Sequence, residues 1–129
     1  MNSFPHRNLD VWKQSMAVVV MIVKITDAIP AKDSWLAKQI RRSAGSMVLN
    51  LGEACGEHSP FERARFLRIS KRSAYETADG LHLVKVYSRP EEKLIEEADD
   101  ALGRVAAMLT KFALRCEADG IKAEITRTK

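Results

Sequence analysis

Two glutamates, a cysteine and a histidine crowd into residues 53–58, the segment EACGEH. Carboxylates, thiolates and imidazoles are the side chains that bind divalent metals. Glu53 and Glu57 are one helical turn apart, but His58 lies about 100° further round a helix. Metal sites in helical bundles use a Glu-x-x-His motif on two helices, and the sequence contains none. We therefore expect neither a metal site nor a bound cofactor.

Cysteine-based catalysis is the second chemistry that this segment suggests. Cys55 and His58 are three residues apart, which allows contact on a helix. A catalytic pair also needs a third group that orients the base, and none is evident. The sequence has no phosphate-binding loop and no dinucleotide fingerprint. We predict that the protein is not an enzyme and that the segment is a corner between two helices.

A stripe of basic residues is the remaining candidate site. Arg65, Arg68 and Arg72 are spaced three and four residues apart, so they share one face of a helix, and Lys71 borders them. No aromatic residue interleaves the arginines, which argues against stacking of bases. These side chains are candidates for contacts to phosphate groups.

The charge distribution is uneven along the chain, whose net charge is +4 with a pI near 9.2. Residues 38–73 hold eight basic and three acidic residues, whereas residues 91–119 hold four basic and eight acidic ones. The asymmetry fits solvated surfaces, complementary faces that meet between subunits, or a phosphate-binding stripe. The sequence leaves these three interpretations open.

The composition indicates one soluble helical domain. The 129 residues suit a single domain, and 46% are hydrophobic while only 6% are aromatic. Cys55 and Cys116 are too few for a disulfide scaffold, so we expect both to be core residues. No signal peptide is visible, and we expect a cytoplasmic location.

Helix start and stop signals divide the chain. Pro30 ends the first helix, and Gly56 and Gly120 are expected to stop the second and fourth. The segments SPFE (59–62) and SRPE (88–91) are capping boxes with proline near the first helical position. The predicted helices span residues 9–28, 34–57, 60–87 and 90–118.

Short connections predict an all-α fold, an up-down-up-down antiparallel four-helix bundle. Residues 1–120 form this single domain, and residues 121–129 are expected to be a flexible C-terminal tail. The corner at residues 58–59 aligns second-helix and third-helix residues whose numbers sum to about 117. The expected neighbours are Arg41 with Glu76, Lys38 with Asp79, and Glu53 with Arg63 and Arg65.

The first helix is apolar on nearly every side, with the run MAVVVMIV at residues 16–23. Eight residues are too few to cross a bilayer, which needs about 20. The helix must then be buried on more than one side, either centrally or against another subunit. Gly45 and Gly52, two turns apart on the second helix, are expected to let a neighbouring helix approach closely.

Four motifs carry a family resemblance: NLDVWKQS (8–15), QIRRSA (39–44), NLGEACG (50–56) and RFLRISKRSAYE (65–76). In their order and spacing over residues 4–118, the chain resembles bacterial four-helix-bundle proteins encoded in intervening sequences of 23S ribosomal RNA genes. The signature positions that match are Trp12, Arg41, Asn50, Glu53, Gly56, Ser73 and Glu76. The chain departs from the pattern at Val48, Ala54 and Arg72, where proline, glycine and glycine are usual.

The resemblance implies an oligomer, a ring that is commonly a homopentamer. Related accessory proteins of diversity-generating retroelements bind nucleic acid and a reverse transcriptase, so both are implied as partners. The resemblance implies no defined biochemical role for the intervening-sequence proteins themselves.

Our hypothesis is a non-enzymatic, oligomeric helical bundle that binds phosphates of RNA or DNA without base specificity. The residues expected to make these contacts are Arg42, Arg65, Arg68, Lys71 and Arg72. The alternative is a protein-interaction scaffold, in which the same basic face meets the acidic fourth helix of a neighbouring subunit or a partner protein.

Overall fold

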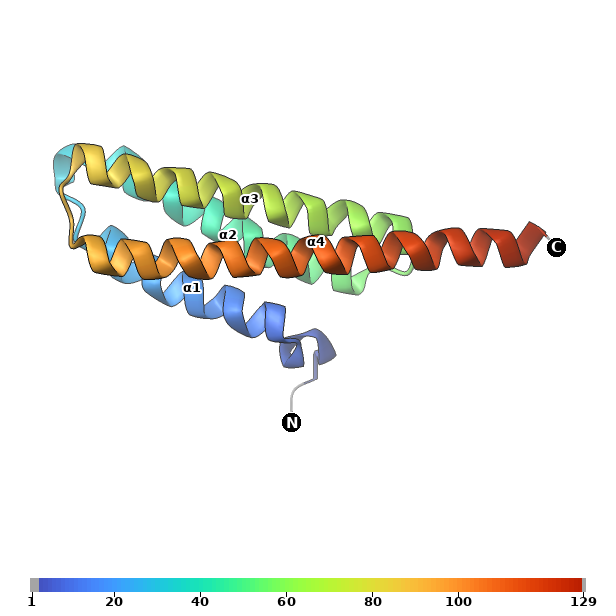
Figure 1. The fold of residues 1–129 in the computed structure, drawn as a ribbon. Coiled ribbons are helices and arrows are strands. Elements are labelled where there is room, and N and C mark those ends of the chain that lie inside the picture. The colour runs from blue at the N-terminus through green and yellow to red at the C-terminus, as the bar shows by residue number, and fades with distance from the viewer. Residues whose placement is uncertain (1–2, 129) are drawn as a thin grey trace.

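The computed structural model describes residues 3–128, which form four α-helices and two short 3-10 helices and contain no β-strand. Consecutive α-helices lie side by side and run in opposite directions (Figure 1). The predicted all-α fold with four helices is confirmed. The elements in chain order are η1 (Pro5–Asn8), α1 (Asp10–Asp27), η2 (Ala31–Asp33), α2 (Ser34–Gly56), α3 (Pro60–Tyr87) and α4 (Glu92–Thr128).

The corner between α2 and α3 lies where the sequence predicts it. The Ser59 hydroxyl accepts a hydrogen bond from the backbone N–H of Glu62 at 3.3 Å, so the predicted cap of α3 is confirmed. α2 ends at Gly56, and the next residue, Glu57, is extended (φ −86°, ψ 140°). No glycine in residues 3–128 has a positive φ. α2 therefore ends without the left-handed glycine that such stops usually use.

The second expected capping box does not form. α4 begins at Glu92, and the Ser88 hydroxyl instead donates to Asp33 Oδ2 at 2.8 Å. Asp33 is buried, and Lys32 Nζ lies 3.3 Å from the same oxygen. Burial of a carboxylate requires such partners. The contact joins the α1–α2 and α3–α4 loops at one end of the bundle.

The structure corrects the expected end of the fourth helix, which continues past residue 118 to Thr128. Gly120 is buried inside α4, where an added Cβ would lie 2.9 Å from Phe61 Cε2, so close packing rather than a helix stop explains this glycine. Extending an existing helix avoids the cost of nucleation. Residues 121–128 of the expected tail are thus helical, and Lys129 lies outside the described residues.

Hydroxyl groups link α2 to α3 within the core. Ser43 Oγ lies 2.7 Å from Thr77 Oγ1, and Ser46 Oγ lies 2.9 Å from Ser73 Oγ. Ser70 Oγ donates to the Met47 carbonyl at 2.6 Å. The paired residue numbers sum to between 117 and 120, which agrees with the expected antiparallel register.

The expected ion pairs across this register are wrong in detail. Arg41 pairs with Asp27 of α1 and donates from Nε to Thr26 Oγ1 at 2.7 Å, whereas Glu76 pairs with Arg42. Adjacent helical residues point about 100° apart, so Arg41 faces α1 while Arg42 faces α3. Within residues 3–128, no ion pair joins Lys38 to Asp79 or Glu53 to an arginine.

Close helix approach occurs at a glycine other than those expected. An added Cβ would meet nothing within 4 Å at Gly45, and at Gly52 it would lie 3.9 Å from His6 Nε2. At Gly80 of α3 it would lie 2.6 Å from Ile40 Cγ1 of α2. Gly80 is therefore the residue that allows α2 and α3 to pack closely.

One side of α1 packs into the bundle and another faces outward. α1 contacts α2 and α4, and its N-terminal end diverges from them in Figure 1. Val18 and Ile22 are buried, whereas Val20 is 57% exposed and Val23 is 45% exposed. Within residues 3–128, no helix is both long enough and apolar enough to span a lipid bilayer.

Candidate nucleic-acid interface

Four basic side chains of α3 surround one hollow on its surface. Spacings of three and four residues place them on the same side of the helix. We call Arg65, Arg68, Lys71 and Arg72 the basic face of α3. The hollow has a volume of about 520 Å³ and is lined by Arg65, Arg68, Lys71, Arg72 and Tyr75. Four of the five residues predicted to bind phosphates therefore lie together.

Arg42, the fifth, lies on α2 and does not line this hollow. Its guanidinium forms an ion pair with Glu76 of α3, and Gln39 Nε2 donates to the same carboxylate oxygen at 2.8 Å. Glu76 is one turn beyond Arg72. Arg42 thus flanks the basic face, with its charge balanced by a carboxylate.

Two arginines of the basic face have acidic partners that the sequence analysis missed. Arg65 Nε donates to Glu62 at 3.0 Å, and this hydrogen bond raises the pKa of Arg65 above its usual value. Arg68 Nη2 donates to Glu117 of α4 at 2.5 Å. The pair of Arg65 with Glu62 is solvent-exposed and contributes little stability, whereas the pair of Arg68 with Glu117 is partly buried. Glu62 is therefore the carboxylate that a phosphate group is able to replace at the smaller cost.

The other two cations are free of acidic partners in the described chain. Arg72 is exposed and makes no hydrogen bond, ion pair or ring contact within residues 3–128. Lys71 Nζ lies 5.7 Å from the centre of the Tyr75 ring, a cation–π contact. Lys71 and Arg72 hold the uncompensated charge of the basic face.

Tyr75 is a residue of this surface that the sequence analysis missed. Its side chain is 60% exposed and lines the same hollow as the four cations. An exposed ring beside cations is the kind of platform on which nucleic-acid bases stack. Tyr75 follows the arginines in sequence rather than interleaving them, and the four-residue spacing from Lys71 to Tyr75 was the signal that places it on the same face.

The basic face continues into a shallow groove between α3 and α4. The groove has a volume of about 370 Å³, and Lys71 and Tyr75 form part of its wall. The small residues Ala74 and Gly103 also line it, as do Asp79 and Asp99. The charge along this surface thus changes from basic to acidic.

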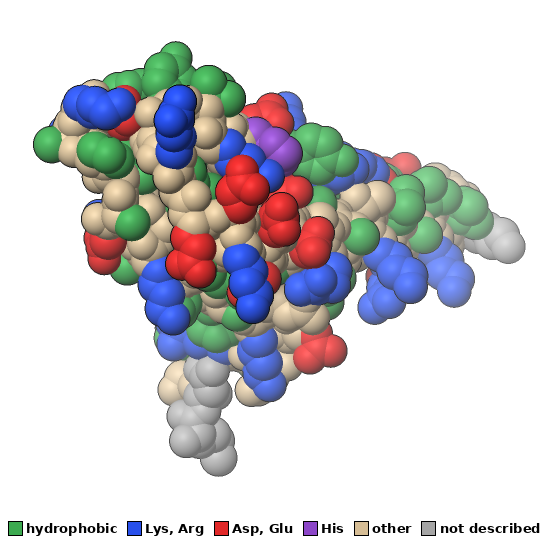
Figure 2. All heavy atoms as spheres, turned by 60° about the vertical axis from the view of Figure 1, so that its left-hand side comes forward, with side chains coloured by type: hydrophobic (Ala, Val, Ile, Leu, Met, Phe, Trp, Pro, Cys, Tyr) green, Lys and Arg blue, Asp and Glu red, His purple; other side chains and the backbone are tan. Residues whose placement is uncertain are grey.

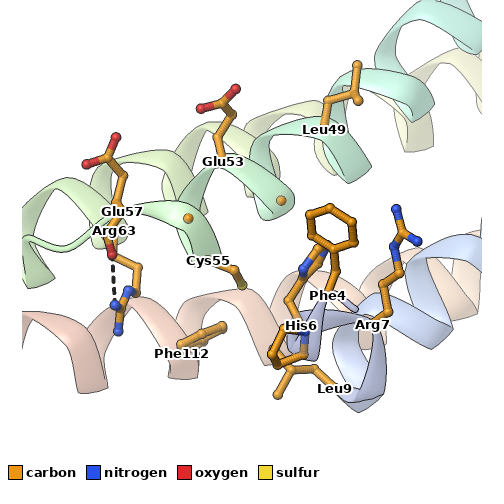
Figure 3. A pocket seen from close by; sticks show the side chains of 13 residues that line it. Phe4, His6, Arg7, Leu9, Leu49, Glu53, Cys55, Glu57, Arg63 and Phe112 are labelled. Atoms are coloured by element: carbon orange, nitrogen blue, oxygen red, sulfur yellow. Dashed lines mark hydrogen bonds between the residues drawn. The ribbon is translucent and has the colours of Figure 1, made fainter. Parts of the chain in front are cut away.

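The acidic segment singled out first contributes Glu53, Cys55 and Glu57 to the lining of another pocket, between η1 and α2. This open pocket of about 710 Å³ is lined by Cys55, Arg63 and Phe112, among others. Figure 3 shows the carboxylates of Glu53 and Glu57 pointing away from His6 and Phe112. No group of three side chains able to hold a metal ion occurs within residues 3–128.

The thiols near this pocket are not activated. Cys55 is half-buried, Cys116 is buried, and neither forms a disulfide. Burial raises the pKa of both thiols, and the nearby Arg63 guanidinium opposes this rise. A nucleophilic cysteine needs a lowered pKa. The predicted role of both cysteines as packing residues agrees with this environment.

Comparison with known proteins supports the resemblance drawn from the sequence motifs. A family model described as 23S rRNA-intervening sequence protein matches residues 7–111. The chain belongs to this family. A protein of unknown function from the S23 ribosomal protein family of Bacteroides thetaiotaomicron has the same fold. Its crystal structure aligns with a TM-score of 0.73 and 23% identity, covering 80% of this chain and 97% of that chain. The comparison with curated proteins gave no match.

In this intervening-sequence protein, several signature positions lie at contacts between structural elements. Asn50 Nδ2 donates to the Ser46 hydroxyl at 3.0 Å, and that hydroxyl also contacts Ser73. Trp12 meets His6 edge to face, with ring centroids 6.1 Å apart. Of the remaining signature residues, Arg41 and Glu76 form the ion pairs described above, Gly56 ends α2, and Glu53 is exposed.

Proposed function

We propose that this member of the intervening-sequence family is a non-enzymatic protein that binds phosphates of RNA or DNA through the basic face of α3. The observation that carries the proposal is the single hollow that four cations and Tyr75 surround, in which Arg72 has no acidic partner. Phosphate contacts position a nucleic acid but do not read its sequence. We therefore expect little base specificity, with Tyr75 stacking on any exposed base.

The test is binding of a fluorescent single-stranded RNA and of a duplex DNA at several salt concentrations. Neutralising Lys71 and Arg72 together, as Lys71→Gln and Arg72→Gln, removes two expected phosphate contacts. The magnitude of the slope of log K against log salt should then fall by about 1.8 for duplex DNA. Such a fall would show that both side chains contact phosphates.

The matched control neutralises Lys13 and Lys24 as glutamines. Both lysines are exposed on α1, and the double change alters the net charge equally. Since α1 packs against α2 and α4 rather than α3, the control should bind almost as the unchanged protein does. Equal losses in the two variants, or no binding at 50 mM salt, would disprove the proposal.

Self-association through the outward side of α1 is part of the proposed function. Val20 and Val23 are exposed there, and Leu49 of α2 is 71% exposed. A hollow of about 400 Å³ between α1 and α2 is lined by Val19, Val23 and Gly45, among others. Burial of apolar surface drives association. The homopentameric ring implied by the family resemblance is the assembly that we propose, and light scattering measures its mass.

The scaffold alternative makes a different prediction for the same side chains. If the basic face holds a neighbouring acidic α4, reversing the charges of Arg65, Arg68 and Arg72 to glutamate should break the oligomer. Phosphate binding predicts an intact oligomer that no longer retains nucleic acid. The pair between Arg68 and Glu117 within one chain favours the second outcome, because α4 already supplies its carboxylate internally.

A further inference from the structure

The C-terminal half of α4 presents a row of exposed apolar side chains. Leu114 is 56% exposed, and Ile121 and Ile125 are each 54% exposed. Together with the exposed Ala118, they are spaced four, three and four residues apart. This spacing is that of a coiled-coil seam. We call these four residues the α4 seam.

The α4 seam lies outside the part of the chain that the family match covers, which ends at residue 111. In Figure 1 the C-terminal end of α4 projects beyond the ends of the other helices. Figure 2 shows hydrophobic side chains along one side of this projecting end and basic ones along another. The bundle of a single chain therefore leaves the end of the seam uncovered.

Charges beside the α4 seam distinguish a parallel from an antiparallel partner. With Ala118 and Ile125 at heptad positions a, Glu117 and Glu124 occupy g, and Arg115 and Lys122 occupy e. Parallel helices bring each g residue near the e residue five positions later in the partner, here Glu117 near Lys122. Antiparallel helices would instead place like charges together, because g then faces g and e faces e.

We propose that the α4 seam binds the α4 seam of a second copy of this chain, with the two helices parallel. The inference rests on the proposed self-association and names one surface that takes part in it. Subunits arranged around a rotation axis along their helices present these helices in parallel, as the charges require.

The energetics favour such a contact although the seam is short. Twelve residues of helix, about 17 Å, are only marginally stable in isolation. Here they continue α4, whose preceding turns are packed in the bundle, so little conformational entropy is lost when two copies meet. Glu117 already accepts hydrogen bonds from Arg68. Carboxylate oxygens have lone pairs to spare for Lys122 of the partner.

Disulfide cross-linking tests the proposal directly. In a parallel pair, position 125 of one copy lies next to position 125 of the other. We expect Ile125→Cys to form covalent dimers under mild oxidation. Ala123→Cys is the matched control, because position 123 is also exposed but lies on the opposite side of the helix. The unchanged chain controls for Cys55 and Cys116.

Two outcomes would overturn the proposal. One is cross-linking of Ile125→Cys no greater than that of Ala123→Cys while light scattering still shows an oligomer, which leaves the proposed self-association standing. The other is preferential cross-linking of Ile125→Cys to Leu114→Cys in a mixture, which would mean an antiparallel contact. Nucleic-acid binding, measured separately, is unaffected by either result.

A second measurement does not depend on new thiols. Ile121→Glu with Ile125→Glu should raise the concentration at which half of the oligomer dissociates at least tenfold, whereas Ala123→Glu should leave it unchanged. These side chains are exposed in the single chain, so circular dichroism should show unchanged helicity. A change of less than twofold in the double variant would contradict the proposed contact.

Discussion

The hydroxyl of Ser43 on α2 lies 2.7 Å from that of Thr77 on α3, and both side chains are fully buried. One of the two hydroxyls donates to the other, and a backbone carbonyl lies within hydrogen-bond distance of each, Ile40 O at 3.0 Å from Ser43 Oγ and Ser73 O at 2.8 Å from Thr77 Oγ1. A buried polar pair of this kind favours one register of the two helices, because a buried hydroxyl that loses its partner costs free energy.

Replacing Thr77 by valine keeps the shape of the side chain and removes its hydroxyl. We expect the free energy of unfolding, measured with urea, to fall by about 1 kcal/mol, because the Ser43 hydroxyl can still donate to the Ile40 carbonyl. Thr110→Val is the control, since Thr110 is half-buried and bonds only to Ala106 of its own helix. An equal loss in both variants would mean that the contact between helices adds no stability.

Gly80 and Gly103 should respond oppositely to alanine. At Gly80 the new Cβ would lie 2.6 Å from Ile40 Cγ1, an atom that cannot move far because it is attached to Cβ. Such overpacking costs roughly 1–3 kcal/mol. At Gly103 nothing lies within 4 Å, so alanine should stabilise the helix by about 1 kcal/mol. Thermal unfolding distinguishes the two, and a higher melting temperature for Gly80→Ala would contradict the packing described.

Removing the two carboxylates that pair with arginines of the basic face of α3 should strengthen phosphate binding. Glu62→Gln with Glu117→Gln frees Arg65 and Arg68 from their acidic partners, so affinity for RNA should rise by roughly fivefold. Glu92→Gln with Glu96→Gln changes the net charge equally at the other end of α4. If both double variants bind equally more tightly, only the net charge matters and the basic face is not the site.

The raised pKa values of Cys55 and Cys116 predict how stability depends on pH. Burial lifts both pKa values above the usual 9.0, so the neutral thiols stabilise the folded chain below pH 9 and this contribution is lost as pH rises further. We expect the difference in unfolding free energy between the unchanged chain and Cys55→Ala with Cys116→Ala to be constant up to pH 8. It should shrink above pH 9, and a difference that grows would reverse the assigned sign.

Much of the fold follows from local signals in the sequence. The corner from Gly56 to Pro60 was predicted because a serine cap and a proline determine where a helix can start, whatever packs against it. The end of α4 was not predicted correctly. Glycine is a common helix stop signal, but Gly120 allows close contact with Phe61, which only the folded chain reveals. Similarly, Gly80 gave no signal, since its role depends on Ile40 of another helix.

The sequence predicted the cations of the candidate site but not the carboxylates that pair with them. Four of the five residues lie around one hollow because helical periodicity alone determines a shared face. The pair of Arg68 with Glu117 depends on the rotation of α4, which the sequence does not specify. The predicted register of α2 against α3 was right within a few residues. Choosing between Arg41 and Arg42 as the partner of Glu76 would have required a register accurate to a single residue.

The hydrogen bond from Ser88 to Asp33 joins the α3–α4 loop to the α1–α2 loop at one end of the bundle. η1 lies at the other end, where α1 diverges from the other helices (Figure 1). The C-terminal end of α1 is also held by the contacts of Arg41 with Thr26 and Asp27, whereas its N-terminal half is held by the packing of Val11, Ser15 and Val18. Amide protons near Val11 should consequently exchange with solvent sooner than those near Ile25.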